Sequence, residues 1–543
     1  MTNMTPSKSW YKRRRYWLLA ILAALIYFCL IPSPLRISPE TTGFTSPLLP
    51  NGDVDYFGAF ENLYLHKLSP PEDNGLRLLI ANCGPRILEQ QPLMDAVPWE
   101  ELPTHEIAQQ WFEKYWLPLC HHMDINPYAK PQFLDSLDFV SFLEKQRKER
   151  EKTATPAGGA QFYFREFVEE FVAVPWTAEE HPDIAQWLEE RSPVLDLFGI
   201  AVRKPNFACY RWREDDLLAI LLPDVQASRT LARDLRVRIA ERLGREDVDG
   251  AWHDVMSLFF LNRKHYIRDP HIVVNMVGIH IEGMGIEAVL RVLQHGNPSP
   301  EQLERFADDL AKLPRKTILD TAAWEEKLVY AFLQKHPETK IYAIGQDGLT
   351  HFSHEISVFY RFLSRWLPSD RNIAGKRVAE LNNIERLPSG NSAENIDWTV
   401  MQKHFEARNH FFDEMDRQLV SPWSLLRIPL IRTRSQLLAY DVIRTYYPAT
   451  EAGQAALFRS NARFDMLCIA MALERYKAAN GGYPDDLELL VPHFLDAVPI
   501  DIFTGRKTLA YRLAPGAAAA YMLYSYGPNG IDDGGVVLER LKN

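Results

Sequence analysis

Three ionisable residues within one apolar segment, 271–294, have the types that acid–base chemistry needs. They are His280, Glu282 and Glu287. An imidazole and two carboxylates that face a common cleft can take a proton from a substrate and return it. The alternative is a structural role, because the same segment contains three glycines that would let helices pack closely. These glycines are Gly278, Gly283 and Gly285.

Two further runs contain residue types that bind metal ions. The first is Cys120-His121-His122-Met123-Asp124, and the second is His351-Phe352-Ser353-His354-Glu355. Adjacent positions on a helix point in different directions, so the first run favours a helix-end cluster over a metal site. The second resembles zinc-protease motifs, but its order matches neither H-E-x-x-H nor H-x-x-E-H. The sequence also lacks a G-x-S-x-G nucleophile elbow and a Walker phosphate-binding loop, so it names no reaction.

The composition is that of a folded protein with an acidic balance. Of the 543 residues, 46% are hydrophobic and 24% are charged, which excludes a wholly disordered chain. This length suits roughly two to four domains, because single cores rarely grow beyond about 300 residues. The formal net charge of -10 argues against nucleic-acid binding, which needs a basic surface. We therefore expect no nucleic-acid partner.

The N-terminal region has the pattern of a membrane anchor. Basic residues from Lys12 to Arg15 precede an uncharged run from Tyr16 to Ile31, and Pro32 ends it. As a helix, these roughly 16 residues span about 24 Å, slightly less than the bilayer core of about 30 Å, and the flanking arginines and aromatic residues can cover the difference. The positive-inside rule places the basic end in the cytoplasm. We expect a cytoplasmic tail at 1–15, one helix across the inner (cytoplasmic) membrane at 16–32, and the bulk of the chain in the periplasm or otherwise outside the cytoplasm.

Two alternatives fit the same N-terminal pattern. A cleaved signal peptide also has a basic end and an apolar core, but this run ends without a small-residue cleavage site. A lipoprotein signal would acylate Cys29, and Tyr27 and Phe28 are too bulky to precede it. Outside the cytoplasm the remaining cysteines could form disulfides, although buried free thiols are the simpler expectation. These cysteines are Cys83, Cys120, Cys209 and Cys468.

After the anchor, the sequence predicts a linker and a large helical body. The linker, 33–56, is rich in Pro, Ser, Thr and Gly, and the body, 57–447, has mainly helical periodicity with a break between subdomains near 245–250. The predicted fold class is therefore mainly α, with a small α+β domain at 456–543. This domain combines a helix at 458–479 with strands at 508–513 and 519–526.

Within the body, several element boundaries are marked by specific residues. Segments 251–263 and 271–294 form a predicted antiparallel helix pair joined at Asp269-Pro270. Ser299 and Gln302 have capping-box spacing around Pro300, which predicts the start of the next helix. Residues 374–396, with their Asn-Asn and Pro-Ser-Gly runs, are predicted as a loop.

The C-terminal region, about 456–535, resembles the head domain of type II secretion major pseudopilins. The matching residues are Ala472-Leu473, Tyr476, Gly482-Tyr483-Pro484, Asp501, Thr504-Gly505, Tyr511, Tyr524-Ser525 and Gly527-Pro528-Asn529-Gly530. In a pseudopilin the hydrophobic helix runs directly into this head, whereas here the apolar run lies far upstream. The resemblance therefore implies an α+β head but not the family's filament assembly.

The resemblance also implies a metal site. Heads of this kind bind calcium in a C-terminal loop, and the corresponding loop here contains Asn529, Asp532 and Asp533. Such oxygen donors suit a hard cation. The alternative is a glycine-rich turn in which the same side chains bond to the backbone. If calcium binds, it would order the loop rather than take part in catalysis.

The chain as a whole resembles a family of bacterial single-pass membrane proteins whose activity is not established; the similar stretches begin PWTAEEHPDIAQ and AWHDVMSLFFLN. We expect a non-enzymatic binding or scaffolding component of the cell envelope, linked to secretion, whose partners are the lipid bilayer and envelope or secretion proteins. The alternative is an envelope hydrolase with an active site between helices of the body, for example around His280 and Glu282. A pocket that joins histidine and carboxylates from distant segments would favour the hydrolase, and a broad apolar groove would favour the binding protein.

Overall fold

The structure is a computed structural model of the chain. It describes residues 8–68, 70–88, 97–106, 108–134, 136–153, 171–212, 222–315, 328–331, 333–334, 369–385, 398–419, 430–514 and 520–535. These residues divide into two compact units. Unit 1 comprises Met1–Phe60, Ala322–Asn391 and Val400–Ala452, and unit 2 comprises Glu61–Thr321, Ser392–Thr399 and Gly453–Asn543.

The described chain is mainly helical, as predicted, with one small antiparallel sheet near its C-terminus. Strand β1 (Ala510–Leu513) pairs with β2 (Tyr521–Tyr524), and Tyr511 lies opposite Leu523. Both strands fall inside the predicted ones. The helix before them, α20 (Ile431–Asn480), begins well before the predicted 458 and ends at Gly481, whose φ of 80° is one that glycine adopts readily.

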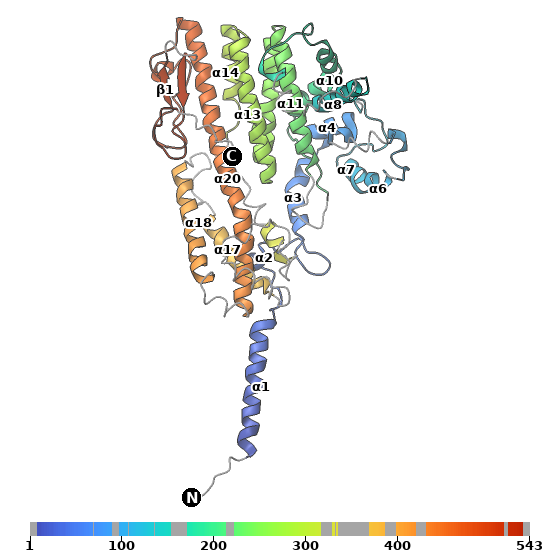
Figure 1. Cartoon of the computed structure of the whole chain (residues 1–543), viewed down its shortest axis with the longest axis vertical. Coiled ribbons are helices and arrows are strands. Elements are labelled where there is room, and N and C mark those ends of the chain that lie inside the picture. The colour runs from blue at the N-terminus through green and yellow to red at the C-terminus, as the bar shows by residue number, and fades with distance from the viewer. Residues whose placement is uncertain are drawn as a thin grey trace. The chain divides into compact units, whose positions relative to one another are not determined.

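Helix α1 (Lys8–Leu30) covers the predicted anchor. Its residues from Arg14 to Tyr27 are all exposed, and Trp17 exposes 71% of its surface. Figure 1 shows α1 as a blue helix near the N-terminus. Within the described residues, the one helix that meets length and composition criteria for crossing a membrane is α13 (Ile272–His295), and half of its apolar stretch is buried, as in the core helix of a globular protein.

Unit 1 contains α1, α2 (Pro39–Thr42), α17 (Arg371–Glu385), most of α18 (Trp398–Leu419) and the first part of α20. Helix α17 packs on α2, where Gly375 lies so close that a Cβ would be 2.0 Å from the carbonyl oxygen of Thr41. The predicted loop at 374–396 is therefore wrong for 374–385, and the rest lies outside the described residues. Three buried residues at helical spacing, Ala374, Val378 and Leu381, explain the helix.

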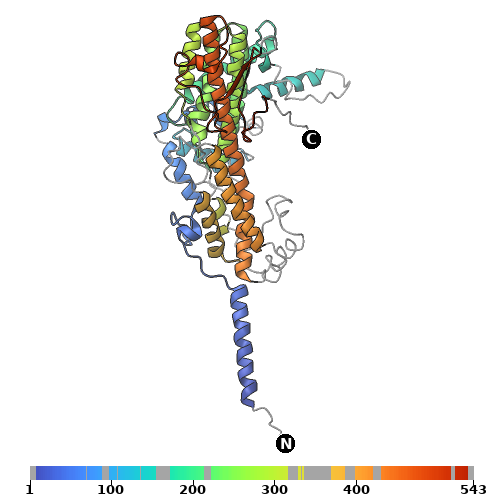
Figure 2. The ribbon, with the colours of Figure 1, turned by 90° about the vertical axis from the view of Figure 1, so that its left-hand side faces the viewer.

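Unit 2 is built around a group of long helices. Helices α10 (Pro182–Ala201), α11 (Pro223–Gly244), α12 (Val248–Phe260) and α13 pack on one another, and α14 (Pro300–Ala311) packs on α12. Figures 1 and 2 both show the second part of α20 beside the green helices α13 and α14. Side chains that are almost fully buried, including Phe259, Phe306 and Phe464, fill the core between them.

Capping residues set the ends of these helices. The Asp247 carboxylate accepts a hydrogen bond from the Gly250 backbone N–H at the start of α12, and His271 Nδ1 accepts one from the Val273 N–H at the start of α13. The predicted capping box at Ser299 and Gln302 is present and begins α14. A π-helical turn (Leu261–His265) and a 3-10 turn (Tyr266–Arg268) complete the connection between α12 and α13, which confirms the predicted helix pair.

Shorter elements cover the rest of unit 2. Helix α4 (Gly75–Cys83) packs on α10. The other helices that the structure describes in this unit are α3 (Tyr56–Leu68, shared with unit 1), α6 (Gln109–Trp111), α7 (Leu117–His122) and α8 (Phe139–Thr153). A π-helical turn lies at Phe112–Trp116, and 3-10 turns lie at Pro71–Asp73, Gly84–Leu88, Trp99–Glu101 and Leu487–Leu490. In the tail, the buried Asp501 accepts hydrogen bonds from the Ser525 hydroxyl and the Tyr526 N–H, which ties the two strands to the preceding loop.

Candidate functional site

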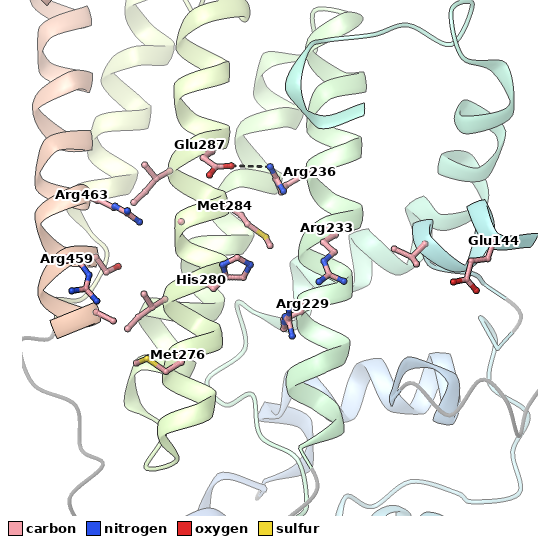
Figure 3. Close-up of a pocket in the computed structure, with 16 residues that line it drawn as sticks. Glu144, Arg229, Arg233, Arg236, Met276, His280, Met284, Glu287, Arg459 and Arg463 are labelled. Carbon is pink, nitrogen blue, oxygen red and sulfur yellow. Dashed lines mark hydrogen bonds and ion pairs between the residues drawn. The ribbon is translucent and has the colours of Figure 1, made fainter. Parts of the chain in front are cut away.

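A pocket of about 1100 Å³ opens in unit 2 between α8, α11, α13 and the second part of α20 (Figure 3). Its most frequent lining residue is arginine. The five arginines are Arg229, Arg233, Arg236, Arg459 and Arg463. Among the lining residues that the structure describes, the acidic ones are Glu144 and Glu287, and none is lysine. A strong excess of positive charge therefore lies at one place on a protein whose net charge is -10.

Helix α11 supplies three of these arginines from one face. Arg229, Arg233 and Arg236 are spaced at i, i+4 and i+7, which brings their side chains to the same side of the helix. Arg236 is 6% exposed and forms an ion pair with Glu287 at 3.1 Å. Like charges at this spacing repel one another, so the arrangement costs stability unless anionic groups offset it.

Helix α20 supplies the other two arginines, from positions more than two hundred residues later in the chain. Arg459 and Arg463 lie one turn apart and are exposed. Figure 3 shows them on the opposite side of α13 from the α11 arginines. Between the two sets, α13 presents Met276, His280 and Met284. The pocket thus has cationic sides and a partly apolar middle.

His280 lines the pocket and lies among the α11 arginines (Figure 3). Partial burial, with Arg229, Arg233 and Arg236, lowers the pKa of His280 below its ordinary value, while Glu287 acts in the opposite direction. The imidazole is therefore neutral at pH 7. It can donate or accept a hydrogen bond, but adds no charge of its own.

Glu282 does not face the pocket with His280 and Glu287. It is 1% exposed, and its carboxylate accepts hydrogen bonds from Asn262 Nδ2 at 2.6 Å, Arg263 Nη2 at 2.6 Å and Ser460 Oγ at 2.9 Å. With both oxygens engaged beside a buried guanidinium, this carboxylate holds helices together. The structure thus brings His280 and Glu287 together and assigns Glu282 to the core.

The three glycines of α13 have different surroundings. A Cβ on Gly278 would lie 2.3 Å from Asn262 Oδ1 and 2.7 Å from Tyr266 Cβ, and one on Gly285 would lie 3.2 Å from the Phe259 ring. Both glycines therefore permit close packing, as predicted. Gly283 lines the pocket, and a Cβ there would meet nothing within 4 Å.

The residues of the first run, 120–124, for which the sequence favours a helix-end cluster over a metal site, have other roles. Burial raises the pKa of the Cys120 thiol to about 12, the His122 ring stacks on Tyr210 with centroids 4.1 Å apart, and Asp124 pairs with Arg77 at 3.2 Å. The second cluster, 351–355, lies outside the described residues. Among the residues that the structure describes, no group of three or more His, Cys, Asp or Glu side chains is placed to hold a metal ion.

In the C-terminal loop, the predicted calcium ligands bond to the nearby backbone. Oδ1 of Asn529, Asp532 and Asp533 accepts a hydrogen bond from the N–H two residues ahead, at 3.2, 2.9 and 3.2 Å. Asp532 Oδ1 also accepts one from the Tyr524 hydroxyl at 2.9 Å. The turn alternative accounts for these contacts, and the calcium site stays a prediction.

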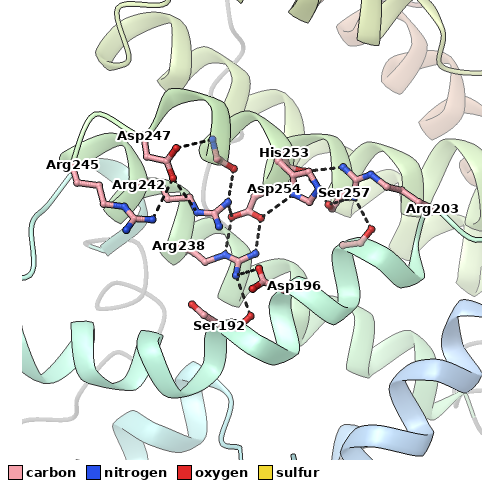
Figure 4. A network of polar contacts seen from close by, with 12 residues as sticks. Ser192, Asp196, Arg203, Arg238, Arg242, Arg245, Asp247, His253, Asp254 and Ser257 are labelled. Atoms are coloured by element: carbon pink, nitrogen blue, oxygen red, sulfur yellow. Dashed lines mark hydrogen bonds and ion pairs between the residues drawn. The ribbon is translucent and has the colours of Figure 1, made fainter.

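A second polar network surrounds the buried Asp254 (Figure 4). Asp254 accepts hydrogen bonds from Arg238 at 2.7 and 2.8 Å and pairs with Arg242 at 3.0 Å, while Arg238 also contacts Asp196 at 2.8 Å. The arginines of α11 that point away from the pocket thus meet carboxylates from neighbouring helices.

Sequence reasoning did not identify the arginine pocket. Arginines at helical spacing usually mark a solvated helix face, and nothing local distinguishes Arg229, Arg233 and Arg236 from such a face. Comparison with protein-family models, with curated proteins and with solved structures found no match to this chain. The functional argument therefore depends on the site itself.

Proposed function

We propose that this chain is a membrane-anchored protein of the cell envelope whose helical body binds an anionic ligand. The observation that carries the proposal is the group of five arginines around one pocket. Arginine presents a planar fork of donors that matches carboxylate and phosphate oxygens in pairs, which lysine cannot do. A bound anion would also relieve the repulsion among these side chains.

Binding is better supported than hydrolysis. Glu282 is held by Arg263 and Glu287 by Arg236, so each of the two carboxylates expected to exchange protons already has a cationic partner. Ser460 is the one hydroxyl-bearing residue among the described residues of the lining, and its hydroxyl donates to Glu282. The described lining therefore presents no free hydroxyl that His280 or Glu144 could activate as a nucleophile, which favours recognition over nucleophilic catalysis.

The anchor is inferred from α1. Its exposed apolar side chains, such as Trp17 and Leu25, would be transferred favourably from water into lipid, at about 25 cal/mol for each Å² removed from water. The basic residues at its N-terminal end favour a cytoplasmic N-terminus and a body outside the cytoplasm. The helix and paired strands of the tail are compatible with a pseudopilin-like head, so we also propose an envelope or secretion protein as partner.

The binding proposal is tested on the full chain in a neutral detergent with inorganic phosphate as probe. We expect saturable binding that weakens with added salt and is weaker still in the double variant Arg459→Gln/Arg463→Gln, which removes two exposed arginines of the pocket. Arg245→Gln, at the end of α11 and outside the pocket, is the matched control and should bind like wild type. Equal binding by both variants would refute the assignment.

The anchor is tested by carbonate extraction and by protease treatment of spheroplasts that contain a C-terminally tagged chain. We expect the protein to stay in the membrane fraction with its N-terminus intact by mass spectrometry, and the tag to be removed by external protease. A tag that is cleaved only after lysis, or a freely soluble full-length protein, would contradict the proposed topology.

A further inference from the structure

The lining of the arginine pocket is apolar as well as cationic. Between the two arginine sets, Met276, Ile279, Met284 and Ile286 of α13 contribute apolar surface, and Val140 of α8 adds to it. A small inorganic anion would occupy one set of guanidinium groups and leave this surface in contact with water. Apolar lining with a few placed charges is typical of a site for a ligand that has both characters.

We propose that this pocket binds an amphiphile, whose phosphate or carboxylate group is held by the arginines and whose hydrocarbon part lies along α13. The proposal rests on the anion-binding function above and specifies its ligand. Arg229 and Arg233, one turn apart on α11, can direct guanidinium donors at a single oxyanion, whereas Arg236 is buried against Glu287. Methionine side chains are flexible and polarisable, so Met276 and Met284 can adapt to a chain of varying length.

Gly283 offers a direct way to fill this pocket without disturbing the protein. It lies on the pocket side of α13, among the apolar residues and one turn from His280, and a Cβ there would meet nothing within 4 Å. A large side chain at this position would occupy the space assigned to the hydrocarbon chain. Because glycine is unfavourable inside a helix, its replacement should not weaken the fold.

The test compares hexyl phosphate, inorganic phosphate and hexanol by calorimetry at pH 8, with the full chain in a neutral detergent. We expect hexyl phosphate to bind at least about tenfold more tightly than inorganic phosphate, because several methylene groups become buried. Gly283→Trp should bind hexyl phosphate no more tightly than inorganic phosphate, while its affinity for inorganic phosphate and its thermal stability stay at the wild-type level. Because hexyl phosphate would enter detergent micelles equally with either protein, this variant also controls for that partition. The double variant Arg229→Gln/Arg233→Gln should bind both hexyl phosphate and inorganic phosphate more weakly than wild type.

The outcomes separate this inference from the function on which it rests. Equal affinity for hexyl phosphate and inorganic phosphate would contradict the proposal of an amphiphilic ligand but not the proposal of anion binding. Hexanol that binds as tightly as hexyl phosphate, or no binding of any probe, would overturn both. If phosphatidic acid in nanodiscs displaces hexyl phosphate and phosphatidylcholine does not, the natural ligand is a membrane lipid. If hexyl phosphate stays bound in the presence of both lipids, the natural ligand is a soluble amphiphile.

Discussion

The hydroxyl of Ser460 donates a hydrogen bond to the buried carboxylate of Glu282, with 2.9 Å between the two oxygens. Ser460 lies on α20 between the pocket residues Arg459 and Arg463, and Glu282 lies on α13. The same carboxylate accepts from Arg263 after the end of α12. One buried group therefore joins α13 and α20, which both line the arginine pocket, to the turn that follows α12.

Glu282→Gln should destabilise unit 2 strongly. It would leave the Arg263 guanidinium, which is 4% exposed, without its compensating charge, and breaking a buried ion pair in this way costs about 3–5 kcal/mol. Arg305→Gln, which breaks an exposed pair with Asp249, is the control and should cost less than about 1 kcal/mol. Chemical denaturation in detergent, followed by tryptophan fluorescence, measures both. Similar losses in the two variants would contradict a structural role for Glu282.

Gly278→Ala and Gly283→Ala should change stability in opposite directions although they lie on the same helix. The first methyl group would collide with Tyr266 Cβ and with the Asn262 side chain, which Glu282 holds in place, at a cost of about 1–3 kcal/mol. The second enters open space and should stabilise by about 0.5–1 kcal/mol, since alanine suits a helix better. Thermal denaturation of both variants provides the comparison, and a shift of the same sign would be inconsistent with the packing described.

Stability should fall as the pH drops below 6.5 because His271 must stay neutral in the fold. Burial, with Arg211 nearby, lowers the pKa of His271 from 6.5 to about 3, and its Nδ1 caps α13 only when unprotonated. The stabilisation is complete above 6.5 and is lost as the pH falls toward 3, at about 1.4 kcal/mol per pH unit, so about 2 kcal/mol is lost by pH 5.

The check is His271→Asn, which keeps an N-cap acceptor but cannot be protonated. Between pH 7 and pH 5 this variant should lose about 2 kcal/mol less than wild type. His265, whose pKa burial lowers to about 4, remains in both proteins and contributes equally. An identical loss in the two proteins would exclude His271 as the titrating group.

Buried thiols should resist alkylation in the native protein. Burial raises the pKa of Cys83 and Cys120 to about 12 and that of Cys209 well above 9.0, and all five cysteines, each among the described residues, are free. We expect iodoacetamide to modify these three only after denaturation in guanidinium, as measured by peptide mass spectrometry. Rapid native modification of Cys209, which is fully buried, would show that this part of the core opens.

Much of the local structure could be predicted from the sequence. The capping box at Ser299 and Gln302, the turn at Asp269-Pro270 and the two strands near the C-terminus depend on residues within a few positions of one another. Such signals act through backbone hydrogen bonds and short-range sterics, which neighbouring residues determine. The helical nature of α1 and its basic flank belong to the same class.

What lay beyond sequence reasoning depends on residues far apart in the chain. The predicted loop at 374–385 became a helix because Ala374, Val378 and Leu381 found a core to enter. Glu282, expected at a cleft, is buried because Arg263 and Ser460 surround it. The candidate site arises only where α11 and α20 bring Arg233 and Arg463 to one pocket. The sequence by itself thus determined which segments are helical, apolar or capped, and the tertiary structure decided which charges meet, because burial and long-range pairing depend on packing that no local pattern encodes.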